Sequence, residues 1–183
     1  MTEITLAPIN FSNPDLIDKI IPELKKFLSS PINVNPLKLD LNFAYSIERG
    51  QYYSTKILQH LLPFSESSKG KFIALVEVDL YIPVFTYVFG EAQLNGKVSL
   101  VSLCRLHEEF YSGNTNEKLL IERTIKEILH ELGHNFGLIH CKDWDCVMHS
   151  SLGIEEVDIK GIDYCRSCKS LIALPEWYIF KKN

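Results

Sequence analysis

The sequence predicts an α/β fold, in which a mixed, twisted sheet supports one long helix and a small C-terminal lobe follows. Strand-like apolar runs alternate with helical patterns over the first part of the chain, which is typical of an α/β sheet. The pair Asn95-Gly96 lies between two β-rich runs and predicts a tight hairpin turn. Two close pairs of cysteines near the C-terminus indicate a lobe too small to be held by an apolar core alone.

The first two elements are a strand and a helix. Residues 3–9 predict a short strand, and Asn13 is the expected N-cap of a helix with Pro14 at its first position, where proline is favoured. Pro22 lies inside the helical pattern, so we expect a kink or a break near it. The core-facing stripe of this helix comprises Leu16, Ile17, Ile20, Ile21, Leu24, Phe27 and Leu28.

The next elements extend the sheet. Pro31 and Pro36 bracket a turn into a second strand, expected at about residues 37–43. Ser54 is the expected N-cap of a second helix. The near-continuous apolar run 72–78 predicts a central strand that is covered on both faces. One side of the second helix carries Ile57, Leu58, Leu61 and Leu62.

The hairpin occupies residues 85–103. We expect its second arm, about residues 98–103, to be an edge strand beside the active-site cleft, where an extended peptide substrate could pair with it. A plain edge hairpin is the alternative. Asn114-x-x-Glu117 resembles a capping box that opens the long helix. The buried side of that helix comprises Leu120, Ile121, Ile125, Ile128, Leu129, Leu132 and Phe136.

The long helix ends in a pattern that indicates a metal site. His130 and His134 are about one helical turn apart, so both imidazoles leave the same face and can reach one ion. Gly137 can adopt the left-handed conformation that ends the helix, which brings His140 to the open side of the metal. Glu131 lies beside the site as the expected general base. An accidental H-E-x-x-H on a helix is the alternative, but the longer run H-E-x-x-H-x-x-G-x-x-H is the metzincin pattern and predicts a catalytic zinc.

The cysteines predict a second metal site. They are spaced C-x4-C and C-x2-C, and two close pairs of thiolates are the ligand set of a closed, tetrahedral, structural zinc. Two disulfides are the alternative. We therefore expect two Zn²⁺ ions per chain, one catalytic and one structural. The expected ligands of the structural ion are Cys141, Cys146, Cys165 and Cys168.

Met148 follows the third histidine at the place of a methionine turn, so we expect it to form the floor of the pocket. Together, the run from His130 to His140, the four cysteines and Val147-Met148 resemble the signature of the archaemetzincins, a family of metzincin-like zinc peptidases. The resemblance implies a compact metzincin-type zincin fold, two zinc ions and peptidase activity. One departure is Ser150, which occupies the position where some metzincins carry a tyrosine that assists catalysis, so no such tyrosine role is expected here.

The leading functional hypothesis is hydrolysis of a peptide bond in a peptide or protein substrate by zinc-activated water, with Glu131 as the base. The rival is a non-catalytic zinc protein that binds peptides or a partner chain in the cleft. A nucleic-acid-binding module built on the cysteines is a third hypothesis. A net charge of −4 disfavours nucleic acid and anionic membranes, since both call for basic patches.

The remaining expectations concern the whole chain. At 183 residues it fits a single metallopeptidase domain, with an upper subdomain over about 1–137 and a lower one over about 138–183. We expect a cytoplasmic protein, because the start of the chain lacks a signal-peptide pattern and no apolar run approaches the length of a membrane span. We also expect a monomer. Cys104 is expected to be a buried small hydrophobe rather than an inhibitory zinc ligand. The acidic residues at 155–158 predict a solvated helix face, and the aromatic run at 177–180 could dock on the body or on a partner.

Overall fold

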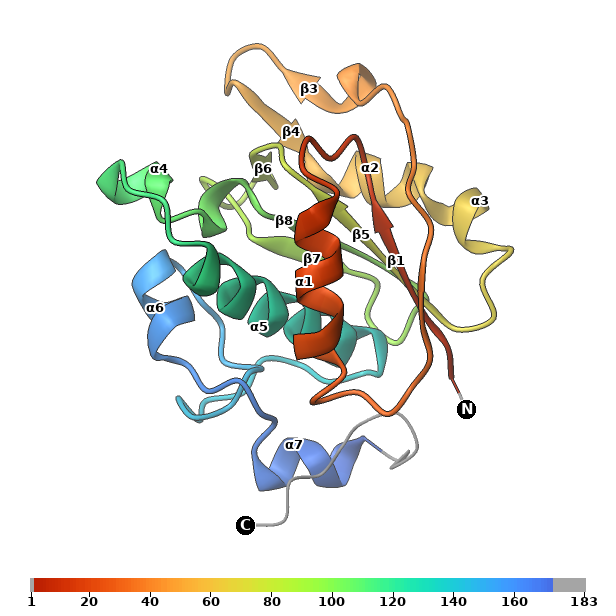
Figure 1. Cartoon of the computed structure of the whole chain (residues 1–183), viewed down its shortest axis with the longest axis vertical. Coiled ribbons are helices and arrows are strands. Elements are labelled where there is room, and N and C mark those ends of the chain that lie inside the picture. The colour runs from red at the N-terminus through yellow and green to blue at the C-terminus, as the bar shows by residue number, and fades with distance from the viewer. Residues whose placement is uncertain (1, 173–183) are drawn as a thin grey trace.

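The computed structural model describes residues 2–172 of the chain. Its centre is a five-stranded sheet with the strand order β2-β1-β5-β8-β7 (Figure 1). Neighbouring strands are parallel except for β7, which is antiparallel to β8, so the predicted mixed sheet is confirmed. The strands are β1 (Ile4–Pro8), β2 (Ile32–Val34), β5 (Lys71–Val76), β7 (Gly90–Ala92) and β8 (Val98–Ser102). A smaller sheet contains β3 (Tyr45–Ser46), β4 (Gln51–Tyr53) and β6 (Leu80–Tyr81).

Helices cover both faces of the larger sheet. The helices are α1 (Asp15–Leu24), α2 (Ser54–His60), α3 (Leu62–Ser65), α4 (Glu109–Ser112), α5 (Glu117–Asn135), α6 (Ile154–Ile159) and α7 (Arg166–Leu171), and the 3-10 turns are η1 (Asn42–Ala44) and η2 (Cys104–Leu106). Figure 1 shows α1 and α5 on one face of the sheet, α2 and α3 on the other, and α6 and α7 in the lower part. No helix within residues 2–172 is both long enough and apolar enough to span a bilayer.

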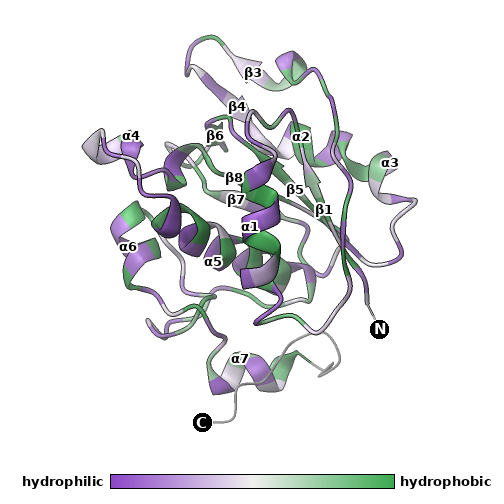
Figure 2. Cartoon of the chain, in the orientation of Figure 1, coloured by the Kyte–Doolittle hydropathy of each residue, from purple (hydrophilic) through white to green (hydrophobic). Residues whose placement is uncertain are grey.

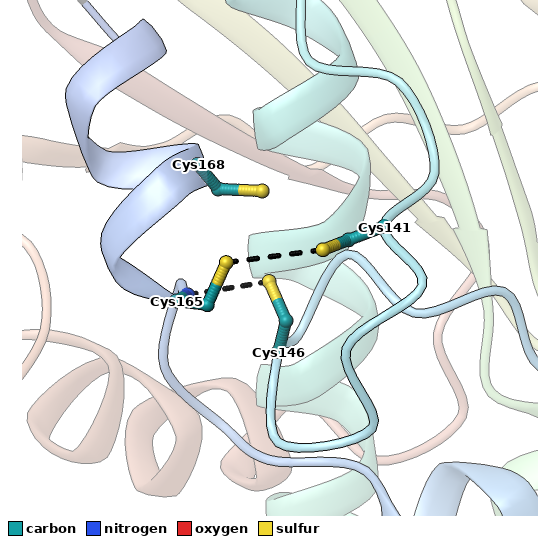
Figure 3. A group of neighbouring side chains, drawn as sticks. All are labelled: Cys141, Cys146, Cys165 and Cys168. Carbon is teal, nitrogen blue, oxygen red and sulfur yellow. Dashed lines mark hydrogen bonds between the residues drawn. The ribbon is translucent and has the colours of Figure 1, made fainter.

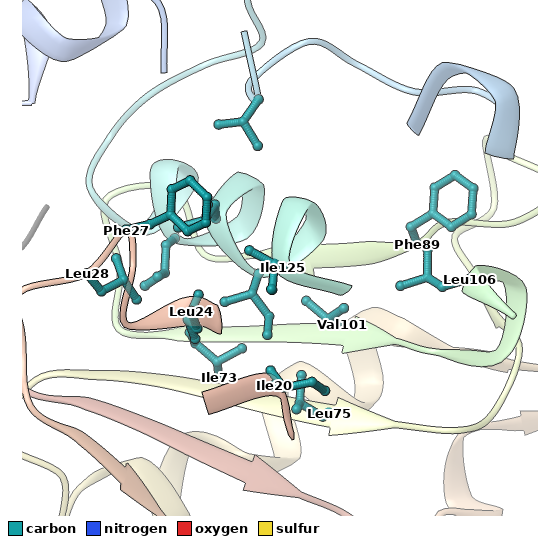
Figure 4. Close-up of a cluster of buried hydrophobic side chains, with 14 of the residues drawn as sticks. Ile20, Leu24, Phe27, Leu28, Ile73, Leu75, Phe89, Val101, Leu106 and Ile125 are labelled. Atoms are coloured by element: carbon teal, nitrogen blue, oxygen red, sulfur yellow. The ribbon is translucent and has the colours of Figure 1, made fainter. Parts of the chain in front are cut away.

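The alternation of side chains along β5 builds two buried clusters. Ile73 and Leu75 belong to the cluster beneath α1 and α5, whereas Phe72 and Ala74 belong to the cluster beneath α2. Figure 4 shows Ile20 and Leu24 of α1 close to Ile73 and Leu75. The first cluster also contains residues of the C-terminal lobe such as Val147 and Val157, so α5 and that lobe share one core.

The first helix forms where it is predicted, but its start is shifted by one residue. It begins at Asp15 with Pro14 rather than Asn13 at the N-cap, while Asn13 Oδ1 accepts a hydrogen bond from the Asp15 amide at 3.2 Å just outside the helix. The helix passes Pro22 and ends at Leu24. Hydrophobic and hydrophilic residues mix along α1 (Figure 2), and the hydrophobic stripe is buried except for Ile21, which is only partly covered.

The second strand is not where the sequence pattern suggested. It lies at Ile32–Val34, inside the segment expected to turn, while residues 37–43 contribute only a bridge from Leu37 to Ile9. The Asn35 and Leu37 amides donate to Leu6 and Pro8 of β1, so the amide position of Pro36 points away from the sheet. Proline is tolerated at such an outward position of an edge strand, and for this reason Pro36 did not end the pairing.

The hairpin is confirmed, but its turn is shifted and its edge strand is the other arm. The Gly96 amide donates to the Gln93 carbonyl at 2.9 Å, so Leu94 and Asn95 are the central residues of the turn, and Asn95 has a positive φ of 53°. Strand β8, expected at the edge, lies between β5 and β7, because the first arm of the hairpin folds over its outer side. The edge beside the cleft is therefore β7.

Three expected local features also differ. The N-cap of α5 is Asn116, whose Oδ1 accepts from the Leu119 amide at 3.1 Å, rather than Asn114. Ser54 does not cap α2, because its buried hydroxyl contacts Glu91 Oε2 at 2.5 Å instead. Asp158 is not simply solvated but forms an ion pair with Arg123 at 2.7 Å. The aromatic run at 177–180 lies outside the described residues.

Candidate zinc sites

The C-terminal half of α5 forms the inner wall of a cleft with a volume of about 710 Å³. Its wall includes His130, Glu131 and His134. The upper rim is drawn from residues 82–94, which lead into and out of β7. The lower rim consists of Ile139, His140, Ser150, Ser151 and Leu152. A volume of this size is typical of a pocket that holds a small ligand or a short peptide.

The chain turns sharply after α5. Gly137 has a φ of +92°, a conformation that favours glycine, and its amide donates to the His134 carbonyl at 2.9 Å. The Leu138 amide donates to the Gly133 carbonyl at 2.9 Å, which completes a Schellman-type end. The Asn95 amide of the hairpin turn also donates to the His134 carbonyl at 2.8 Å. The end of the helix is thus fixed both by its own turn and by the hairpin.

The two helical histidines are oriented by backbone carbonyls. His130 Nδ1 lies 2.8 Å from the Val147 carbonyl, and His134 Nδ1 lies 2.8 Å from the Leu138 carbonyl. Because a carbonyl can only accept, each Nδ1 must carry the proton and each Nε2 must present a lone pair. The two Nε2 atoms face each other at 3.1 Å, which is repulsive unless a cation lies between them. A tetrahedral zinc with Zn–N bonds of about 2.0–2.1 Å separates its nitrogens by about 3.3 Å, so the arrangement fits this metal.

His140 completes the group. The ligand atoms of His130, His134 and His140 all lie within 4.8 Å of one another. The side chains become progressively more exposed along this series, from the buried His130 to the exposed His140, so the open side of the group faces the cleft. Burial, followed by the charge of Lys160, holds the pKa of His130 well below its usual range, which favours the neutral form that binds metals.

Glu131 is buried next to the histidines and beside the edge strand. Its exposed fraction is 4%. A Cβ on Gly90 of β7 would lie 2.5 Å from Glu131 Oε1, so only glycine leaves the carboxylate its place. Burial, and then the neighbouring Glu127 carboxylate, hold the pKa of Glu131 well above its usual range. A carboxyl with a raised pKa beside a metal-binding group has the proton affinity that acid–base chemistry requires.

The cysteines form a second group. The sulfurs of Cys141, Cys146, Cys165 and Cys168 lie within 4.8 Å of one another, and Figure 3 shows the four side chains converging from the loop after α5 and from the start of α7. The Cys141 and Cys165 sulfurs are 3.8 Å apart, which equals the separation of about 3.8 Å expected for Zn–S bonds of about 2.3 Å. All are free thiols rather than disulfides. Burial raises the pKa of Cys146 to about 11, so the cluster needs a cation to become a set of thiolates.

Met148 lies directly under the metal-binding helix. It is fully buried, and a Cβ on Gly133 would overlap its sulfur. Its carbonyl accepts from the Cys141 amide at 2.9 Å, and the preceding Val147 carbonyl orients His130. The segment 146–148 thus connects the cysteine cluster to the histidine group.

The sequence did not point to two other groups in the cleft. Glu127 and Lys160 form an ion pair at 2.7 Å with side chains 4% and 0% exposed, and both contribute to the cleft wall. Glu127 lies one turn before Glu131 on α5, and that spacing was the one available signal. Lys160 follows α6 and carries no local signal. The other unpredicted group is Tyr87 on the upper rim, whose hydroxyl donates to the Leu152 carbonyl at 3.0 Å.

The weaker candidates lie elsewhere. Cys104 belongs to neither ligand group in the described part of the chain, and it precedes Arg105 behind the upper rim. His149 stacks on Trp144, with ring centroids 3.9 Å apart, and is not part of the cleft wall. His60 lies between Phe43 and Phe64. None of these histidines contributes to the metal-binding groups in residues 2–172.

Comparison with known proteins agrees with this geometry. Residues 16–173 match the family model described as peptidase family M54. The archaemetzincin of Methanocaldococcus jannaschii is 41% identical over 157 residues, which is 84% of this chain and 86% of that protein. The crystal structure of an archaemetzincin from Methanopyrus kandleri has a TM-score of 0.80 at 32% identity and covers 93% of each chain. A zinc-dependent peptidase from Methanocorpusculum labreanum has a TM-score of 0.82 at 28% identity, covering 92% of this chain and 99% of that one. The chain therefore belongs to the archaemetzincin family, peptidase family M54, and is a zinc-dependent metallopeptidase.

Proposed function

We propose that His130, His134 and His140 hold the catalytic zinc ion and that Glu131 is the general base of peptide-bond hydrolysis. The observation that carries the proposal is the pair of Nε2 lone pairs facing each other at 3.1 Å, beside a buried carboxyl. A zinc ion held there would supply Lewis acidity, which lowers the pKa of a bound water to about 7 and polarises a carbonyl. The Glu131 carboxylate takes a proton from the attacking water and delivers it to the leaving amine.

The edge strand supports a path for the substrate. The outer side of β7 has no strand partner among residues 2–172, and this strand lies along the cleft beside Glu131. We propose that an extended peptide pairs with this edge by strand addition. The peptide replaces the missing neighbour of β7, and the absence of a side chain on Gly90 lets its backbone come close to the carboxylate.

The cysteine cluster is proposed to hold a second, structural zinc ion. Its sulfur spacing and its position at the junction of α7 with the loop after α5 support this assignment. Native mass spectrometry should find two zinc ions per chain in the wild type and one in Cys165→Ser/Cys168→Ser. The control variant Cys104→Ser should keep two. A wild-type chain with a single ion would contradict the assignment.

The peptidase proposal is tested by profiling a diverse peptide library with zinc-loaded protein. Cleavage by the wild type, and not by Glu131→Gln, is the expected result. If the two proteins bind zinc equally and neither cleaves any peptide, the cleft acts in peptide or partner binding rather than in hydrolysis.

We further propose that the protein is a cytoplasmic monomer of one peptidase domain, divided near residues 137 and 138. The buried cluster shared by α5 and the C-terminal lobe supports a single domain. Four thiolate ligands require a compartment that keeps thiols reduced. Elution from a sizing column as one chain, and no binding to single- or double-stranded nucleic acid at low salt, are the expected results.

A further inference from the structure

A hydrogen bond connects the two rims of the cleft. The Tyr87 hydroxyl donates to the Leu152 carbonyl at 3.0 Å. Tyr87 belongs to the upper rim and Leu152 to the lower rim, and both line the cleft that contains Glu131. We call this contact the rim bridge. It links residues that are 65 positions apart in the sequence.

The donor side of the rim bridge is held firmly. The Arg105 guanidinium stacks on the Tyr87 ring at 4.0 Å, and Phe89 contacts the ring edge-on at 5.5 Å. Asp79 fixes Arg105 through hydrogen bonds of 2.6 and 2.7 Å. Burial raises the pKa of Tyr87, so its hydroxyl keeps the proton that it donates. The tyrosine is thus positioned by its surroundings before any substrate arrives.

The acceptor side is held as well. The Leu152 amide donates to Glu156 Oε2 at 2.6 Å, and Gly153, the N-cap residue of α6, follows Leu152 directly. Helix α6 is in turn bound to α5, because Arg123 pairs with Asp158 at 2.7 Å. The lower rim therefore cannot move away from Tyr87 without disturbing its connection to the catalytic helix.

The rim bridge lies to one side of the reactive centre. Gly90 contacts Glu131, and Tyr87 precedes Gly90 by three residues, which corresponds to at most about 10 Å along an extended strand. The other side of the cleft is lined by Ala92, Leu94 and Ile139. There the hairpin is hydrogen-bonded to the end of α5, from the Asn95 amide to the His134 carbonyl at 2.8 Å, and not to the described residues of the lower rim. An extended substrate covers the distance from Gly90 to Tyr87 with about three residues.

We infer that the rim bridge closes one end of the cleft and limits the substrate to about three residues beyond the scissile bond on that side. This inference rests on the proposed peptidase function. The inner wall of the cleft contains the fully buried Glu127–Lys160 pair, so a longer peptide cannot pass deeper without exposing these charges. A longer substrate must instead open the rim bridge. Tyr87 is thereby a specificity-determining residue for substrate length.

The test uses two series of peptides that share one scissile bond found by library profiling. One series is lengthened residue by residue at the N-terminus and the other at the C-terminus. For the wild type, kcat/KM should fall beyond about three residues in one series and stay level in the other. In Tyr87→Phe, which keeps the ring and loses the hydroxyl, the ratio of kcat/KM for the longest to the shortest member of that series should rise by up to about tenfold.

The control is Tyr45→Phe. Tyr45 is an exposed tyrosine of β3 whose ring contacts Tyr52, and it does not line the cleft. The length ratio of this variant should equal that of the wild type. Equal cleavage of all lengths by the wild type would overturn the inference, as would an unchanged ratio in a folded Tyr87→Phe protein.

A binding measurement separates this inference from the peptidase proposal. If the wild type cleaves no peptide, the peptidase proposal fails, and the length limit is measured by fluorescence anisotropy with labelled peptides and zinc-loaded Glu131→Gln protein. Affinity that falls beyond the same length in one series supports the rim bridge as a barrier. Affinity that is independent of length, or the absence of any peptide binding, overturns it.

Discussion

The orientation of the two histidine rings on α5 depends on one backbone carbonyl each. The Nδ1–H groups of His130 and His134 donate to the Val147 and Leu138 carbonyls. Both Nε2 lone pairs therefore point toward the same position in the cleft. Such contacts fix the tautomer and raise the basicity of a ligand. The carbonyls come from the two segments that follow the helix, so the ligand geometry depends on the folded chain around it as well as on the helical spacing.

Glu131→Gln tests the role of the buried carboxyl. The amide keeps the size of the side chain but cannot accept a proton, so kcat/KM should fall by about 100-fold or more. Peptide hydrolysis and zinc content should be measured on the same sample. Glu122→Gln, on the exposed side of the same helix, is the control and should retain wild-type turnover. Full turnover in Glu131→Gln would show that another group is the base.

Gly133→Ala tests the close contact between α5 and Met148. Alanine normally stabilises a helix interior by about 1 kcal/mol relative to glycine. Here its methyl group would overlap the Met148 sulfur and come within 3.1 Å of the Tyr164 ring, so the free energy of unfolding should fall by about 1–3 kcal/mol. Urea denaturation measures the change. Met148→Ala in the same chain makes room for the methyl group, so the two substitutions together should cost less than the sum of their separate effects.

At the scale of elements, α5 does more than present ligands. Its exposed N-terminus is capped by Asn116, its middle binds α6, and its end is fixed by Gly137 and the hairpin turn. Lys126 donates to the Val157 and Asp158 carbonyls at 3.0 and 2.9 Å, so the last turn of α6 is bound directly to α5. Movement of α6 would therefore shift the lower rim of the cleft relative to the histidines.

The N-cap of α5 predicts that two nearby asparagines, Asn114 and Asn116, contribute differently to stability. Asn116→Ala removes the acceptor of the Leu119 amide and should lower the free energy of unfolding by about 1 kcal/mol. Asn114→Ala should change it by less than about 0.5 kcal/mol, because this residue lies on the surface before the helix. Thermal or urea unfolding measures both variants. The opposite order would favour the capping box expected from the sequence pattern.

The Glu127–Lys160 pair gives a second prediction at this scale. Lys160→Met leaves the Glu127 carboxylate buried without its partner, and the free energy of unfolding should fall by about 3–5 kcal/mol. The double variant Glu127→Leu/Lys160→Met removes both charges and should recover most of that loss. A double-mutant cycle in urea yields the coupling energy. Additive effects would mean that the two charges do not interact in the folded protein.

At the scale of the whole molecule, the cysteine cluster and the sheet support the same site from opposite sides. The buried cluster under α5 includes Cys146 and Cys168 together with Ile73 and Leu75 of the sheet. Because the lobe packs into this shared core, loss of the proposed structural zinc should affect the protein as a whole rather than the lobe alone.

Zinc removal tests this connection. Chelation of the wild type, or Cys165→Ser/Cys168→Ser, should lower the melting temperature and expose the lobe to proteolysis, because a structural zinc supplies folding free energy. Calorimetry and limited proteolysis measure the two effects. His140→Ala is the comparison, since an exposed ligand on the cleft side should weaken binding of the catalytic ion with a smaller loss of stability. Equal losses in the two variants would show that the cysteine cluster has no special structural role.

Local spacing within the sequence was sufficient to predict both candidate ligand groups. One helical turn separates His130 from His134, Gly137 provides the turn to His140, and the cysteines occur in two close pairs, so each group could be predicted from neighbours along the chain. The central strand β5, the Asn95-Gly96 hairpin and the amphipathic α1 were predictable for the same reason, because periodicity and turn chemistry act over a few residues.

Other features were decided only by tertiary structure. β7 lies at the edge, although the pattern of β8 is as strand-like, because the sheet order depends on how the hairpin folds against β5. Pro36 could follow an edge strand because its amide position faces away from β1, a fact that no local pattern contains. Contacts such as Glu127–Lys160 and Tyr87–Leu152 join residues far apart in the chain, and nothing in either local segment indicates its partner. The sequence by itself therefore determined which histidines and cysteines form the two candidate ligand groups, whereas the packing of distant segments decided the shape of the cleft, since only the folded chain brings its two rims together.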